Sequence, residues 1–127
     1  MKKTLFFLLA GVAVGTAQAQ LSEQEENNVI LPAAAQKCVL PAAPDAIPEE
    51  ADYDQLVAAK GQVSEFQVGL LVYRECLGAA ETGSDDLTAG NKQALVASYN
   101  YSVEMEERVA ARFNEAIRSY KERTAKN

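Results

Sequence analysis

The sequence predicts an all-α fold: an antiparallel helical hairpin of two long helices with an extended, proline-rich N-terminal strap, stapled by a disulfide. Three observations predict this fold. Residues 88–126 contain no proline, and their apolar side chains recur every three or four residues, the spacing of one helix face. Residues 56–80 carry an apolar heptad repeat. The chain has two cysteines, Cys38 in the strap and Cys76 in the first helix.

Residues 1–19 have the form of a secretory signal peptide. Lys2 and Lys3 precede a short apolar run over residues 5–14, and an Ala-x-Ala site ends at Ala19. An uncleaved anchor is the alternative, but a bilayer span takes about 20 apolar residues. We therefore expect a periplasmic or secreted protein with no membrane span after cleavage.

Removal of Lys2 and Lys3 with the signal leaves 10 basic and 18 acidic residues, a net charge of −8. Such a chain is repelled by phosphate backbones and anionic lipid, so we expect no nucleic-acid partner. A cationic partner is compatible with this charge, although acidity that keeps the protein soluble is the simpler interpretation. Residues 20–28 are polar and acidic, and we expect a mobile acidic tail there.

Residues 29–50 are rich in alanine and proline and predict the strap. Proline disrupts regular helix and favours extended or polyproline II backbone. The stretch is nevertheless too apolar for a plain linker, so we expect it to lie across the helices. Residues 41–44 match the PxxP pattern, a weak signal in an exported protein. The four prolines are Pro32, Pro41, Pro44 and Pro48, and the apolar residues include Ile30, Leu31, Val39, Leu40 and Ile47.

An even cysteine count in an exported chain predicts a disulfide between Cys38 and Cys76. The 37 residues between them form a loop whose closure contributes roughly 4 kcal/mol in the chain-entropy model. A redox or metal-binding pair is the alternative, and the spacing is far from Cys-x-x-Cys. We expect no metal and no cofactor.

The first helix should begin near Asp52, which with Gln55 forms a capping-box pattern. A strand over residues 68–73 is the alternative, since that run is apolar and partly β-branched, but the heptads continue through it. We call the two heptad series the heptad seam: Leu56, Ala59, Val63, Phe66, Leu70, Tyr73, Leu77 and Ala80.

Nearly every residue between Phe66 and Tyr73 is apolar, so this segment needs a second cover besides the facing helix. Gly69 and Cys76 lie on one flank of the heptad seam, where we expect the strap to dock. Close approach of the strap would explain Gly69. The glycines at 61 and 78 have no such explanation.

The turn over residues 82–87 is short, so the two helices of the hairpin domain, residues 52–126, should be antiparallel neighbours. Gly83 suits the end of the first helix, and Ser84, Asp85, Asp86 or Thr88 can cap the second. The second helix is the longer and extends past the start of the first. Either the strap or another chain must cover its end, with Phe113, Ile117 and Tyr120.

The sequence offers little catalytic chemistry. It has no histidine, the commonest general base and metal ligand, so we expect no enzyme. Glu106 falls at an apolar stripe position; it either forms a polar site in the bundle or reaches water or pairs with Arg108 or Lys60. Acidic clusters over residues 45–54 and at 85–86 lack EF-hand spacing and are best explained as helix caps and solvated surface.

Aromatic residues of the second helix are candidate interface anchors, although half-buried core with a wet hydroxyl is the commoner role of a tyrosine. Tyr73 of the first helix should lie across from two of them. The possible interface residues are Tyr73, Tyr99, Tyr101, Phe113, Ile117 and Tyr120.

Five short stretches of the chain are distinctive: residues 38–41 (CVLP), 47–48 (IP), 73–77 (YRECL), 103–106 (VEME) and 113–114 (FN). Together they resemble a group of small, uncharacterised exported helical proteins of Gram-negative bacteria. The chain departs from that group in having Glu49-Glu50 in place of Asp-Gly. The resemblance implies the cysteine pair and the helical hairpin, and it implies no activity.

Three functions remain open. The first, which we favour, is a non-catalytic protein-binding or adaptor module that presents a helical face. The second is a self-associating structural envelope protein, a four-helix dimer, suggested by the overhanging end of the second helix. The third is a small-ligand carrier or weak enzyme that uses Glu106 and the tyrosines.

Overall fold

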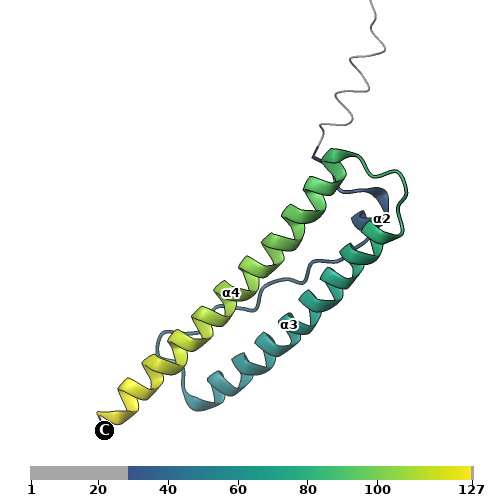
Figure 1. The fold of residues 1–127 in the computed structure, drawn as a ribbon. Helices are drawn as coiled ribbons and strands as arrows, with labels where there is room; N and C mark the ends of the chain where they lie inside the picture. Colours follow the sequence, from purple (N-terminus) through teal and green to yellow (C-terminus); the bar gives the residue numbers. More distant parts are fainter. Residues whose placement is uncertain (1–28, 127) are drawn as a thin grey trace, which may run out of the picture.

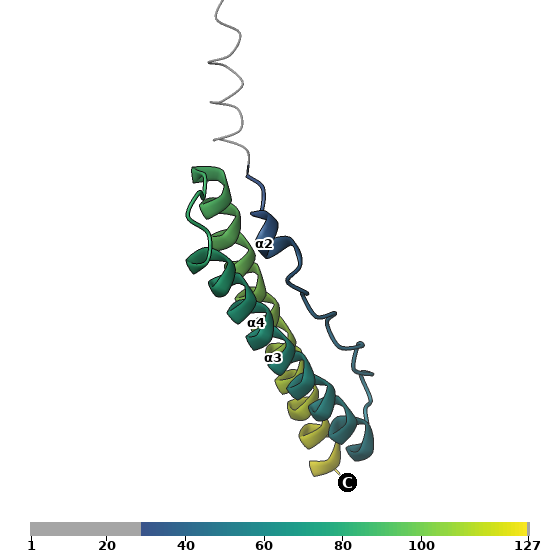
Figure 2. The ribbon, with the colours of Figure 1, turned by 90° about the vertical axis from the view of Figure 1, so that its right-hand side faces the viewer.

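The computed structural model describes residues 29–126, and the predicted signal peptide and acidic tail lie outside them. Two long helices dominate, α3 (Tyr53–Thr82) and α4 (Ala89–Ala125). They run side by side in opposite directions, and the strap crosses one side of the pair (Figures 1 and 2). At 1.5 Å per residue, helices of 30 and 37 residues are about 45 and 55 Å long. The predicted all-α hairpin with its strap is confirmed.

Capping residues set where both long helices begin. The Asp52 carboxylate accepts the backbone N–H of Gln55 at 2.8 Å, and the Gln55 side chain accepts the N–H of Asp52 at 2.9 Å. Thr88 and Asn91 form the same reciprocal pair at the start of α4. Each pair satisfies two backbone donors that a helix end otherwise leaves without partners.

The heptad seam forms the core between the two helices. Its eight residues are the buried residues of α3, and Leu70 is fully buried. From α4, Leu95 packs at the turn end of the hairpin and Val109 at its middle. The helical interpretation of residues 68–73 is therefore confirmed, and the strand alternative is wrong.

The strap is extended except for one helical turn, α2 (Ala33–Gln36), which corrects the prediction of a wholly extended segment. Pro32 occupies the N-cap of this turn, where proline costs no hydrogen bond, and no proline follows before Pro41. Ala35 in this turn is 1% exposed and packs among the core residues at the turn end of the hairpin. The strap therefore contributes to the core.

Three contacts fix the strap along the hairpin. Cys38 and Cys76 form the predicted disulfide. The Asn91 amide of α4 donates to the Ile30 carbonyl at 2.7 Å. At the far end, Arg123 donates to the carbonyls of Glu49 and Ala51 at 2.8 and 2.7 Å.

The strap reaches the end of α4, where Arg123 binds its backbone. The Arg123 contacts hold the strap against this end, and Ala51 is 1% exposed. Phe113, Ile117 and Tyr120 are each half-buried, and Phe113 packs against the core between the two helices.

Gly69 lies where the strap comes closest to α3. A Cβ added there would stand 3.0 and 3.1 Å from two Pro41 side-chain carbons, whereas at Gly61 or Gly78 it would meet nothing within 4 Å. Pro41 is rigid and follows the disulfide-bonded Cys38 closely, so it cannot easily move away.

We predict that Gly61→Ala raises the free energy of unfolding by up to about 1 kcal/mol, because alanine favours helix over glycine. Gly69→Ala should instead lower it, since the clash with Pro41 outweighs that gain. Urea unfolding of both variants at low protein concentration measures the difference. Equal stabilisation by the two substitutions would show that the strap does not press on α3.

Candidate interface on helix α3 and the Arg74 cluster

A polar cluster links the two helices near mid-hairpin, and we call its residues Arg74, Tyr99, Ser102 and Glu106 the Arg74 cluster. Arg74 Nε donates to Ser102 Oγ at 2.8 Å, and Arg74 Nη2 donates to Glu106 Oε2 at 2.7 Å. Ser102 is fully buried, and its hydroxyl donates to the Tyr99 carbonyl at 2.6 Å. The Arg74 guanidinium carbon also lies 5.7 Å from the centre of the Tyr99 ring, a cation–π distance.

This cluster corrects the expectation for Glu106. Its partner is Arg74, on the other helix, and neither Arg108 nor Lys60. Arg108 instead pairs with Glu104 on its own helix. The Arg74 and Glu106 side chains are 13% and 30% exposed, so the pair is shielded from water and holds α3 to α4.

The Arg74–Glu106 pair should contribute more to the free energy of unfolding than an exposed salt bridge does. In a double-mutant cycle of Arg74→Met and Glu106→Gln, we expect a coupling free energy of about 1 kcal/mol or more. The Glu115–Arg118 pair on α4, with side chains 62% and 68% exposed, is the control and should give no more than about 0.5 kcal/mol. Equal coupling in the two cycles, measured by urea unfolding, would contradict a stabilising role for the cluster.

The predicted interface residues divide into three groups. Tyr73 is 7% exposed and belongs to the core, so a partner cannot contact it on the folded surface. Tyr99 and Tyr101 are 48% and 50% exposed, and Tyr99 is engaged with Arg74. The remaining three, Phe113, Ile117 and Tyr120, are half-buried at the end of α4.

Four exposed apolar side chains lie elsewhere, on the side of α3 that faces away from α4. We call this surface the outer face of α3. The strap covers only the flank with Gly69 and Cys76, so the second cover predicted for residues 66–73 is incomplete. The outer face consists of Val57, Val68, Leu71 and Val72, which are 53, 61, 56 and 61% exposed.

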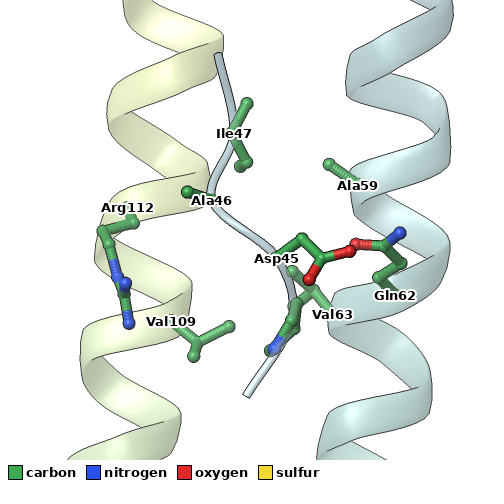
Figure 3. Close-up of a pocket in the computed structure, with 9 residues that line it drawn as sticks. Asp45, Ala46, Ile47, Ala59, Gln62, Val63, Val109 and Arg112 are labelled. Carbon is green, nitrogen blue, oxygen red and sulfur yellow. The ribbon is translucent and has the colours of Figure 1, made fainter. Parts of the chain in front are cut away.

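The structure has a small cavity under the strap and larger open grooves on its surface. Where the strap crosses both helices, a cavity of about 30 Å³ is lined by Ile47, Val63 and Val109 among others, with the side chains of Asp45 and Arg112 at its edges (Figure 3). A cavity of this size holds a water molecule or two, whereas small-molecule sites occupy about 300–1,000 Å³. A larger open groove of about 560 Å³ runs between the strap and α4. Arg123, one of its lining residues, donates its hydrogen bonds to strap carbonyls.

Among residues 29–126, no group of three or more acidic, cysteine or histidine side chains is placed to hold a metal ion. Within the same residues, no helix is both long enough and apolar enough to cross a membrane. In comparisons with known proteins, no family model matches the chain, and no curated protein or solved structure matches it significantly.

Proposed function

We propose that the chain is an exported, non-catalytic protein-binding module and that the outer face of α3 is its binding surface. One observation carries the proposal. The buried side and one flank of α3 are already covered, yet Val57, Val68, Leu71 and Val72 remain more than half exposed. Single exposed apolar residues are common on protein surfaces, whereas a group along one helix face is typical of an interaction site.

The disulfide supports the exported location. Disulfides form and persist in oxidising compartments and are rare in the cytoplasm. Cys38 and Cys76 are bonded to each other, and residues 1–19 have the pattern of a signal peptide. A periplasmic or secreted protein accounts for both features.

The Arg74 cluster supports a binding role over the ligand-carrier and enzyme alternatives. The Glu106 carboxylate, the best candidate for acid–base chemistry, is held by Arg74 across the helix pair. The cavity under the strap has room for little more than water. The groove of about 220 Å³ beside the cluster is lined by Arg74 and Tyr99, whose guanidinium and ring contact each other, and the Glu106 carboxylate is not part of its lining.

A photocrosslinking amino acid placed at Val72 tests the surface. Val72 is on the outer face, 61% exposed, and does not belong to the core. In cells that produce the protein, we expect a discrete crosslinked product from residue 72. The matched control carries the same amino acid at Tyr101, a half-exposed candidate anchor on α4.

A product from residue 72 with none from residue 101 supports binding through α3. The reverse pattern would move the interface to the tyrosines of α4 and overturn the assignment. No product from either position, with the protein folded and abundant, would overturn the binding function.

A further inference from the structure

The exposed side of α3 carries a set of positions at heptad spacing, with the apolar Val68 and Leu71 at its centre and small or polar residues on either side. We call it the outer seam, and all six of its residues are exposed. Within each of its two series the residues are seven apart, and the series alternate by three and four residues, the spacing of a coiled-coil interface. The series are Ser64, Leu71 and Gly78, and Gly61, Val68 and Glu75.

The outer seam is symmetric about its own centre. A twofold axis that passes between Gly69 and Leu70, perpendicular to the helix, generates a second copy. A residue that lies a given number of positions before the axis in one copy then faces the residue that lies the same number of positions after it in the other copy. Val68 then faces Leu71 of a second copy, Ser64 faces Glu75, and Gly61 faces Gly78. Each facing pair takes one residue from each series, as layers of antiparallel helices do. An isologous interface requires this self-complementarity, in which residue i contacts j and j contacts i.

We propose that the partner of this face is a second copy of the chain, bound antiparallel through α3 to α3 about this axis. The inference rests on the proposed function and names the occupant of the same surface. At the centre, Val68 and Leu71 would bury each other twice. Beside them, each Ser64 hydroxyl can donate to a Glu75 carboxylate of the other copy.

The two glycines of the outer seam support close packing of the helices. Neither meets any atom within 4 Å of an added Cβ, so contacts inside the chain do not require glycine at these positions. Each nevertheless weakens an exposed helix by up to about 1 kcal/mol relative to alanine. Opposed glycines on two helices allow the backbones to approach closely, which gives both residues a role.

Charges along one edge of the outer seam are complementary under the same symmetry. Lys60 and Glu81 lie on the flank of α3 that also carries Arg74, away from the strap. In the described part of the chain neither forms a salt bridge. In the proposed antiparallel register, Lys60 of one copy approaches Glu81 of the other, and the twofold axis creates two such pairs.

Sedimentation equilibrium of the full chain without reductant, over a series of concentrations, tests the proposal. We expect a concentration-dependent dimer. Leu71→Glu places a charge in both central layers and should weaken the dimer by at least about 100-fold, whereas Val39→Glu, on the strap at 78% exposure, should leave it unchanged. Gly61→Leu should weaken the dimer without destabilising the monomer, because the monomer has space there.

The charge pairs test the register. Lys60→Glu and Glu81→Lys should each weaken the dimer about tenfold, and the double exchange should restore it. A dimer that is indifferent to Leu71→Glu, or single charge variants that the double exchange does not rescue, would overturn this arrangement. A strictly monomeric wild type would also overturn it; the proposed function would survive if residue 72 still crosslinks to a different protein, and would fail if it crosslinks to nothing.

Discussion

Leu70→Ala should lower the free energy of unfolding by about 2–5 kcal/mol, a large share of the stability of a domain of this size. Leu70 is fully buried and packs with Val63, Phe66 and Val109 at the middle of the heptad seam. Truncation removes its apolar contacts and leaves a cavity that two rigid helices cannot close. Urea unfolding followed by circular dichroism measures the loss.

The adjacent residue supplies a matched control. Leu71→Ala is the same chemical change one position along the same helix, at a side chain that is 56% exposed. It should change the free energy of unfolding by no more than about 0.5 kcal/mol in the dilute protein. Similar losses for the two substitutions would show that α3 does not have one buried side and one free side, and the assignment of its outer face would fail with it.

Replacing both cysteines with serine should lower stability by about 4 kcal/mol, the second large effect that we expect. The bond joins residues 38 positions apart, and closing a loop of that length removes much entropy from the unfolded chain. Loss of the bond also releases the strap beside Gly69, where it packs closely on α3. The helices themselves should still form in the variant.

The measurement for the disulfide is thermal unfolding of the double variant beside the wild type with and without reductant. The reduced wild type and the variant should unfold at nearly the same temperature, both well below the oxidised protein. A Cys38→Ser, Cys76→Ser protein that melted like the oxidised parent would show that the strap is held by its other contacts alone.

Regular patterns made the helical framework predictable. The heptad repeat identified all eight buried residues of α3. Apolar residues that recur with a period of seven lie on the side of a helix that packs against a neighbouring helix. Asp52 with Gln55 marked the start of α3, since the capping box is a local signal. The crowded position of Gly69 followed from its place on the flank shared with Cys76.

Features set by contacts between distant segments were harder to predict. The partner of Glu106 proved to be Arg74, and the register between α3 and α4 that brings them together depends on turn geometry. A signal did exist, because Arg74 directly follows a residue of the heptad seam and so lies at its edge. The helical turn at Ala33–Gln36 was missed because the proline count of the whole strap outweighed a local run of alanines.

The outer face of α3 was visible in the sequence, but the strap that was expected to cover residues 66–73 covers them only in part. The apolar run from Phe66 to Tyr73 indicates a need for a second cover besides α4, and the flank with Gly69 and Cys76 indicates the strap. An extended segment is narrow, however, and the strap covers one flank of the helix only. The remainder, with Leu71 and Val72 exposed, is the basis of the function proposed here.

Footprinting of aliphatic side chains by a photogenerated carbene tests that function most directly. The protein is labelled once purified and dilute, and once inside the cells that produce it, and the labelled positions are read by mass spectrometry. We predict that Val68, Leu71 and Val72 are labelled in the dilute protein and protected in the cells, while Val39 on the strap is labelled equally in both. Equal labelling of the outer face of α3 in the two settings would mean that nothing binds there and would contradict the account.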